Sequence, residues 1–259
     1  MNEHAAASAE ASAPEAPRET SPPLPRIHPI ERMAAAAEVI LCSGFPTQLF
    51  LIGVLSLSGM RMRTDAGQLS PPFVFLLSLL DTILLVALIW FLLRSHRESP
   101  REVLFGRQPV LREAMLGALL LPLIFVGILV VLMLILTVAP QLHNVPRNPL
   151  ENMLRTRGDA VIFGFIAMFA GGVREEVQRG FILHRFERFL GGGAVGVIVF
   201  SALFGLGHID QGYDAMIATG LLGAFWGIVY LIRRSIVAPM VSHAGFNLAQ
   251  LAKYLVVAG

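Results

Sequence analysis

The amino-acid sequence predicts an all-α fold, a polytopic bundle of transmembrane helices that follows a disordered N-terminal tail. Of the 259 residues, 55% are hydrophobic and only 15% are charged, whereas soluble proteins carry about 25% charged residues. The mean hydropathy of +0.67 is too high for one or two soluble domains. The net charge of +2 does not indicate a nucleic-acid-binding protein, because the arginines lie between apolar runs, as membrane-flanking charges do.

About seven segments have the length and apolar character of a membrane span, or nearly so. A spanning helix needs about 20 mostly apolar residues. We expect spans at residues 36–58, 72–94, 113–139, 159–184, 192–208, 213–232 and 236–258. Residues 1–33 are rich in Ala, Pro, Ser and Glu and cannot bury enough apolar surface to fold. The sequence therefore predicts a disordered tail at 1–33 and a transmembrane domain at 34–259.

Loop arginines predict that the N-terminus is cytoplasmic, because cytoplasmic loops carry an excess of positive charge. The arginines on that side are Arg18, Arg26, Arg32, Arg94, Arg97, Arg101, Arg107, Arg112, Arg185, Arg188, Arg233 and Arg234. The opposite side holds Arg61, Arg63, Arg147, Arg155 and Arg157. We expect a multi-pass protein of a cell membrane, with a composition typical of a bacterial inner-membrane protein.

Two isolated residues in the first half are expected to be structural. Cys42 is the only cysteine, which excludes an internal disulfide and a thiolate metal cluster. It lies in an apolar run, so we expect it to be buried. Asp81 lies in the middle of the second predicted span, where a carboxyl group needs a hydrogen-bond partner or must stay neutral.

Polar side chains gather in the second half of the chain, beginning with the pair Glu175-Glu176. Two charged, unpaired carboxylates at a membrane helix are costly. Arg179 follows Glu175 by four residues, so we expect these two to pair on one helix face. Glu176 would then point about 100° away and remain free to act as a base. A solvated helix end is the alternative reading of this group.

Two further groups place histidines in apolar helices. Phe204-Gly-Leu-Gly-His208 closes the fifth predicted span, and His243 and Asn247 lie four residues apart, on one helix face. Hydrogen bonding between helices would explain each group alone. Together with Glu175 and Glu176, His208, His243 and Asn247 supply what amide hydrolysis needs: a general base, a proton relay and donors for an oxyanion. These five are the candidate catalytic residues.

The three groups resemble the motifs of the CAAX protease and bacteriocin-processing family, also called CPBP or Abi, which includes the type II CAAX prenyl endopeptidases. That family has a Glu-Glu pair followed by Arg, then Phe-x-x-x-His, then His-x-x-x-Asn. Here these read Glu175-Glu176 with Arg179, Phe204 to His208, and His243 to Asn247, in the same order. The resemblance covers residues 160–250. Two residues separate the Glu pair from Arg179 where the family usually has three, which leaves Glu175 and Glu176 as rival bases, with Glu175 favoured.

The resemblance implies an intramembrane endopeptidase in which Glu175 and His208 activate a water molecule while His243 and Asn247 stabilise the oxyanion. Arg179 and Phe204 would have structural and pairing roles. The chain lacks a His-Glu-x-x-His zinc signature, so we expect no cofactor. Zinc held by Glu175, His208 and His243 is the alternative.

The expected partners are a membrane-associated peptide or protein substrate and the lipid bilayer, with no nucleic acid. The identity of the substrate stays open. A non-catalytic immunity or membrane-protein scaffold factor and a proton-coupled transporter are the alternative functions.

A geometric condition accompanies this site. With straight spans, Glu175 and His243 lie nearer the cytoplasm than His208. The three converge only if the fourth helix is long and tilted, or if the fifth is short or bent at its glycines. We expect the side chains of Glu175, His208 and His243 to lie within about 12 Å of one another.

Overall fold

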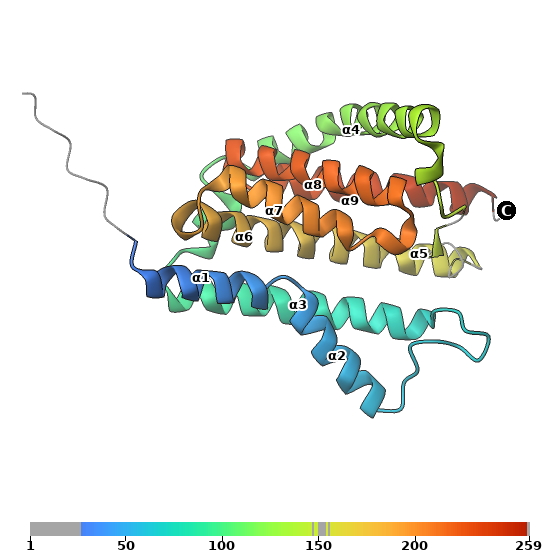
Figure 1. Cartoon of the computed structure of the whole chain (residues 1–259), viewed down its shortest axis with the longest axis horizontal. Helices are drawn as coiled ribbons and strands as arrows, with labels where there is room; N and C mark the ends of the chain where they lie inside the picture. Colours follow the sequence, from blue (N-terminus) through green and yellow to red (C-terminus); the bar gives the residue numbers. More distant parts are fainter. Residues whose placement is uncertain (1–26, 147, 150–153, 155, 258–259) are drawn as a thin grey trace, which may run out of the picture.

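The computed structural model describes residues 27–146, 148–149, 154 and 156–257. These residues form helices and no strand, which confirms the predicted all-α membrane bundle (Figure 1). The α-helices are α1 (Pro29–Leu41), α2 (Phe45–Leu57), α3 (Pro71–Ser95), α4 (Val110–Val138), α5 (Arg157–Ile166), α6 (Glu175–Phe189), α7 (Gly193–Leu206), α8 (Tyr213–Arg233) and α9 (Val237–Val257). Shorter turns are η1 (Arg101–Phe105), η2 (Pro140–Leu142), η4 (Ala167–Arg174) and η5 (Ile209–Gln211). Of the sequence predictions, residues 1–26 of the tail, Arg147 and Arg155 lie outside the described residues.

Helices lie in all seven predicted spans, but among the residues that the structure describes only α3, α4 and α8 are long and apolar enough to cross a membrane alone. The pair α1 and α2, bent by 44°, would make a fourth span. The segment predicted as a span at 36–58 is therefore bent: the chain breaks between Cys42 and Gly44, where Gly44 has a φ of +89° that only glycine adopts without strain. As predicted, Cys42 is buried and free.

The first helix begins earlier than the predicted end of the tail. Residues 29–33 belong to α1, because the His28 side chain accepts a hydrogen bond from the Ile30 backbone N–H while the Glu31 carboxylate accepts one from the His28 backbone N–H. Such a reciprocal cap satisfies backbone groups that would otherwise be exposed at the helix start. The predicted boundary at residue 33 is corrected to the start of α1 at Pro29.

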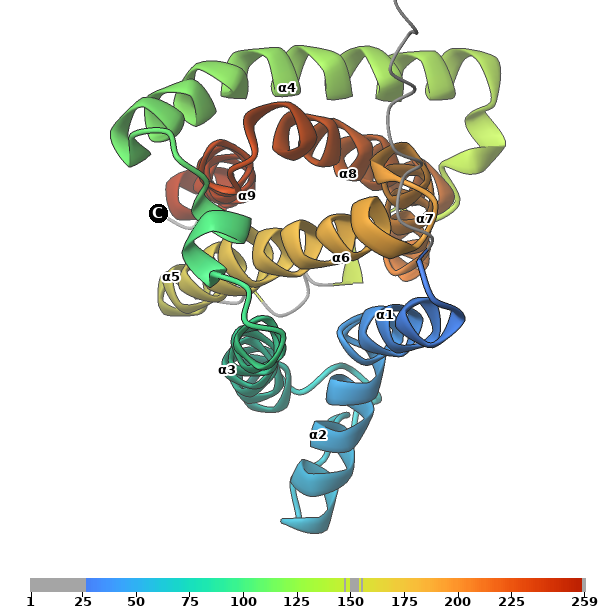
Figure 2. The same cartoon turned by 90° about the vertical axis from the view of Figure 1, so that its left-hand side faces the viewer.

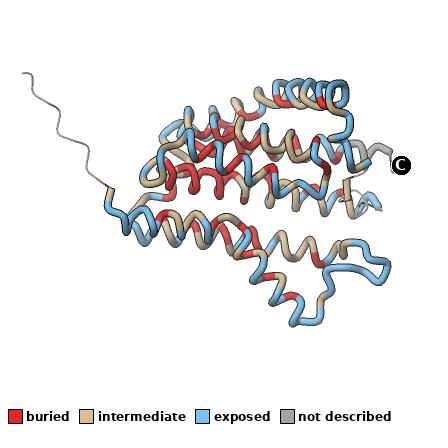
Figure 3. Tube along the Cα trace, in the orientation of Figure 1, coloured by how far each residue is buried: buried red, intermediate tan, exposed pale blue. Residues whose placement is uncertain are grey.

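The site is built around one long, continuous helical segment, in which α5, η4 and α6 follow each other without a break from Arg157 to Phe189. This segment runs through the middle of the bundle, with α4, α8 and α9 on one side and α1 to α3 on the other (Figure 2). Ten of the fifteen residues of α6 are buried, and the same stretch is among the most enclosed parts of the chain (Figure 3). The middle of the bundle is therefore a polar helix surrounded by apolar ones.

Small residues let the surrounding helices approach closely. A Cβ on Gly205 of α7 would lie 2.7 Å from the Met216 carbonyl oxygen of α8, and one on Gly117 of α4 would lie 2.6 Å from the Ala238 carbonyl oxygen of α9. Close approach at small residues is the usual packing device of membrane helices, where lipid removes the hydrophobic drive for helix association.

An ion-pair cluster ties the far half of α6 to α1 and to the end of α3. Arg185 donates to Glu38 over 2.6 Å and to Glu98 over 2.5 Å, and Glu98 also accepts from Arg188. His184 completes the set, with Nε2 3.1 Å from Glu98. Partial burial works to raise the pKa of Glu98, but the hydrogen bonds and charges of His184 and Arg185 outweigh it and lower that pKa from 4.5 to about 2.

Candidate active site

The π-helical turn η4 brings the central helix against α9. Its wider turns place two glycines, Gly171 and Gly172, at the contact. A Cβ on Gly172 would lie 2.7 Å from the Ala244 Cβ, and one on Gly171 would collide with the Asn247 amide. Because both positions are glycine, the His243–Asn247 face of α9 can lie directly against the start of α6.

Glu176 is the buried anchor of the site. Its side chain is 1% exposed, and its Oε1 accepts a hydrogen bond from Arg179 and lies 2.8 Å from Nδ1 of His243. The predicted pairing of Arg179 with Glu175 is therefore wrong: Arg179 pairs with Glu176, three residues away. Positions three and four apart are both neighbours on a helix, so sequence spacing alone did not decide between them.

Aromatic rings explain which carboxylate Arg179 takes. Its guanidinium carbon lies 5.1 to 5.5 Å from the ring centroids of Phe200, Phe204 and Trp226, which come from α7 and α8. Such rings attract a cation through their electron-rich faces. The enclosure holds the Arg179 side chain, which is 1% exposed, on the Glu176 side of α6.

His243 joins the two glutamates. Its Nδ1 faces Glu176, and its Nε2 lies 3.7 Å from Oε2 of Glu175. The imidazole stacks on Trp226 with ring centroids 3.8 Å apart and an interplanar angle of 17°. Trp226 is itself fixed, because its Nε1 donates to Ser242 Oγ over 3.0 Å. These contacts hold the imidazole plane and direct one nitrogen to each glutamate.

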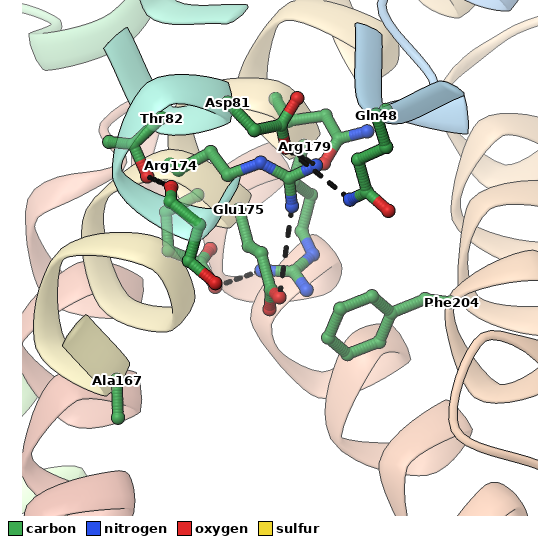
Figure 4. A network of polar contacts seen from close by, with 12 residues as sticks. Gln48, Asp81, Thr82, Ala167, Arg174, Glu175, Arg179 and Phe204 are labelled. Atoms are coloured by element: carbon green, nitrogen blue, oxygen red, sulfur yellow. Dashed lines mark hydrogen bonds and ion pairs between the residues drawn. The ribbon is translucent and has the colours of Figure 1, made fainter. Parts of the chain in front are cut away.

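Glu175 is more accessible than Glu176 and is less tightly paired. Its side chain is 18% exposed, and its two nearest charged partners lie 3.7 Å (His243) and 4.0 Å (Arg174) away, beyond hydrogen-bond length. Arg174 is instead bonded to Asp81 of α3, with Nη2 2.6 Å from Oδ2 (Figure 4). The Glu175 carboxylate is thus surrounded by polar groups without being tightly paired.

Phe204 connects the second motif to the third. Its ring centroid lies 5.0 Å from that of His208 and 6.4 Å from that of His243, both edge-on. Nδ1 of His208 lies 2.8 Å from the Phe204 carbonyl oxygen, which leaves Nε2 at the other end of the ring. The helix before His208 is short, since α7 has only 14 residues and ends at Leu206, and the fourth predicted span is part of the long segment described above.

Asn247 lies one turn beyond His243, on the same face of α9. Its Nδ2 donates to the Ala167 carbonyl oxygen over 3.3 Å. A carboxamide nitrogen carries two hydrogens, so the second one can be donated elsewhere. Asn247 thus has a fixed orientation and a donor to offer.

Sequence reasoning did not assign three residues to this site that the structure places around it: Arg174, Asp81 and Trp226. Asp81 stood out as a carboxyl group inside a span, and it is indeed buried and hydrogen-bonded, but its partner Arg174 lies on a distant part of the chain. Trp226 carried no signal, because an aromatic residue in an apolar span is ordinary. Among the described residues, no three His, Cys, Asp or Glu side chains are grouped so that they could hold a metal ion, and the set Glu175, His208 and His243 is not brought together in that way.

The fold and the site together define a helical membrane protein with a polar, hydrolase-like constellation enclosed by its helices. Residues 157–249 match the protein-family model for Rce1-like proteins, described as type II CAAX prenyl endopeptidase Rce1-like. This match confirms the resemblance to the CAAX protease family that was predicted over residues 160–250. No curated protein and no solved structure matched the chain.

Proposed function

We propose that this protein is an intramembrane endopeptidase in which Glu175 is the general base, while Glu176 and Arg179 orient His243. The observation that carries the proposal is the position of His243, with Nδ1 on the buried Glu176 and Nε2 toward the more accessible Glu175. A carboxylate that holds one imidazole nitrogen fixes the tautomer and stabilises the charged ring, as in serine protease triads.

In the proposed reaction, Glu175 takes a proton from a water molecule whose oxygen attacks the carbonyl carbon of the peptide bond. His208 assists in placing this water. The developing oxyanion accepts hydrogen bonds from the Asn247 amide and from Nε2–H of His243, which is a donor in the proposed step because the ring is an imidazolium held through Nδ1–H by Glu176. The carbon–nitrogen bond then breaks, and Glu175 returns the proton to the leaving amine. The products are one new carboxyl terminus and one new amino terminus.

The choice of Glu175 over Glu176 follows from pairing and access. Glu176 is 1% exposed and already bonded to Arg179 and His243, so it can neither meet a water molecule nor give up its charge without breaking those bonds. Glu175 is 18% exposed and lacks a partner at hydrogen-bond distance in the site.

The substrate class that we propose is a membrane-associated peptide or protein. A cavity of about 530 Å³ with almost wholly apolar walls lies between α3 and the segment formed by α5 and η4. Phe75, Leu79, Phe165 and Phe169 are among its lining residues. Ala167, the first residue of η4, accepts the bond from Asn247, and Phe169 of the same turn lines the cavity, so η4 contacts both the cavity and the site. This supports an apolar, membrane-anchored substrate portion beside the scissile bond.

We further propose that the protein is a multi-pass membrane protein whose N-terminus is cytoplasmic and that its chemistry needs no metal. The arginine bias of the loops supports the orientation. A cysteine-accessibility scan would check it: a cysteine introduced at exposed Arg101 should react with a membrane-impermeant reagent only in inverted vesicles, and one at exposed Asp65 only in right-side-out vesicles.

The test of the function compares cleavage by the purified protein in liposomes that contain membrane proteins from cells lacking the gene. Mass spectrometry would record new amino termini. Wild type should create specific new termini, Glu175→Gln should create none, and a zinc chelator should leave the rate unchanged. Loss of cleavage on chelation, restored by zinc, would favour the metalloprotease. Wild-type liposomes that yield no new termini would contradict the protease and favour an immunity or scaffold role.

A further inference from the structure

Arg174 stands between two carboxylates and is bonded to only one of them. Its Nη2 lies 2.6 Å from Oδ2 of Asp81, whereas its Nη1 lies 4.0 Å from Oε1 of Glu175. Both members of the bonded pair are almost inaccessible, with side chains 9% and 3% exposed for Arg174 and Asp81. Figure 4 shows the arrangement, with α3 and η4 bringing the three side chains together.

The Asp81 carboxylate is itself held in place from the broken first span. Thr47 Oγ1 donates to it over 2.6 Å and Gln48 Nε2 over 3.3 Å. The carboxylate therefore accepts from two side chains of α2 in addition to Arg174. These contacts fix the position of the Asp81 carboxyl group.

The break between α1 and α2 also fits the Arg174 side chain. Gly44, in the left-handed conformation, leaves room for it: a Cβ there would lie 2.6 Å from Nη2 of Arg174. In the same place, Gln178 Nε2 of α6 donates to the Cys42 carbonyl oxygen over 2.8 Å. The bend between α1 and α2 thus contacts Arg174 and Gln178 of the central segment, and α2 supplies Thr47 and Gln48, which hold Asp81.

We propose that Asp81 is a positioning residue that holds Arg174 and thereby keeps Glu175 available as a base; the inference rests on the proposed role of Glu175. A guanidinium next to two carboxylates bonds to the better-placed one. With Asp81 present, that is Asp81. Without it, Arg174 is a buried cation that has lost its partner, which is unfavourable, and the nearby carboxylate of Glu175 can replace that partner. Closing the remaining gap would convert the base into a tightly paired carboxylate.

Among the described residues, two charged or ionisable side chains are paired with Glu175, so a change in its activity as a base can be traced to one of them. Arg174 approaches from η4 and His243 from α9, while Asp81 of α3 acts through Arg174. Glu176 reaches the same place through His243. Of the contacts of Arg174, His243 and Glu176 named here, removal of the Asp81 charge directly affects only the one made by Arg174.

The test uses Asp81→Asn, the double variant Asp81→Asn with Arg174→Met, and a matched control. The control is Glu113→Gln, which removes the buried carboxylate of another cross-helix pair, with Arg233 of α8, away from the site. The probe is a synthetic peptide that spans the bond cleaved by wild type in the liposome assay, and rates are expressed per folded protein.

For Asp81→Asn we expect kcat to fall about 10- to 100-fold with KM within about twofold, as for lost transition-state stabilisation. The double variant should regain most of kcat, because no guanidinium remains to capture Glu175. Glu113→Gln should lower the thermal midpoint to a similar degree and leave kcat unchanged.

Equal kcat values for Asp81→Asn and Glu113→Gln at matched folded fraction would overturn the proposal, as would a double variant no more active than Asp81→Asn. These results are distinct from failure of the proposed function, which would appear as an active Glu175→Gln. An inactive Glu175→Gln together with a fully active Asp81→Asn would refute the positioning role alone.

Discussion

Helices α4 and α6 reverse the pattern expected of a soluble protein. The most apolar 18-residue stretch of α4 has a mean hydropathy of 3.3, and only 11% of that stretch is buried inside the protein. Helix α6 carries Glu175, Glu176, Arg179, Arg185 and Arg188, yet ten of its fifteen residues are buried. The hydrocarbon of a bilayer accepts apolar side chains and excludes charges, so the polar helix is enclosed and the apolar one faces lipid.

The difference between the two helices also predicts how substitutions in each of them will act. Apolar substitutions on the outer face of α4 replace one apolar side chain by another in contact with lipid. Substitutions of the charged residues of α6 leave their partners as unpaired charges inside the bundle. Within α6 itself, Glu176 belongs to the enclosed, paired class and Glu175 does not. Each of the following variants breaks or sharpens one part of this comparison, and they are taken from the largest expected effect to the smallest.

The Arg179 guanidinium should be the most costly group to remove. Arg179→Met leaves Glu176 as a buried carboxylate without its cation, so we expect about 3–5 kcal/mol of lost stability. Unfolding of the purified protein in a mixture of mild detergent and lipid would measure this. A loss below about 1 kcal/mol would show that the Arg179 charge, which Phe200, Phe204 and Trp226 enclose, is not needed to stabilise the fold.

Close packing at the π-helical turn should matter for activity more than for stability. In Gly171→Ala, the added methyl group would collide with the Asn247 amide and displace it. We expect kcat to fall about 10-fold or more, in line with the loss of one oxyanion donor. Gly53→Ala, where a Cβ meets open space, is the matched control and should leave cleavage unchanged. Normal kcat in Gly171→Ala would remove Asn247 from the mechanism.

Acid should weaken the cluster at the far end of α6 before it affects the apolar helices. The pKa of Glu98 is about 2 in the folded protein, below its ordinary value of 4.5. A lowered carboxyl pKa contributes stability that is complete above 4.5 and is lost as the pH falls toward 2. Thermal midpoints measured between pH 6 and pH 2 should fall in this window. In Glu98→Gln, the decrease across this window should be smaller; an identical decrease would contradict the role of Glu98.

The outer face of α4 should be nearly insensitive. Leu123 is 59% exposed on a helix that faces lipid, so Leu123→Ala should change unfolding stability in lipid by less than about 0.5 kcal/mol. A loss above 2 kcal/mol, measured in the same detergent–lipid mixture as for Arg179→Met, would mean that this face packs against protein.

The sequence predicted much of the fold because apolar runs of span length are strong signals in a membrane protein. The break between Cys42 and Gly44 was missed, since hydropathy averages over a single glycine. In the site, motif residues were found because Glu, His and Asn are rare in apolar helices. The pairing of these residues was not predicted correctly, because whether Arg179 bonds to Glu175 or to Glu176 depends on aromatic rings from α7 and α8. The contact of Asp81 with Arg174 joins distant segments, which no local pattern encodes.

The central claim is that the two adjacent glutamates have different roles, with Glu175 as the base and Glu176 as the anchor of His243. The most direct measurement compares kcat and the thermal midpoint for Glu175→Gln and Glu176→Gln on the same probe peptide. We expect Glu175→Gln to lose about 10²- to 10⁴-fold in kcat with an unchanged midpoint, and Glu176→Gln to lower the midpoint together with activity. An active Glu175→Gln, or an inactive Glu176→Gln that melts like wild type, would contradict this assignment.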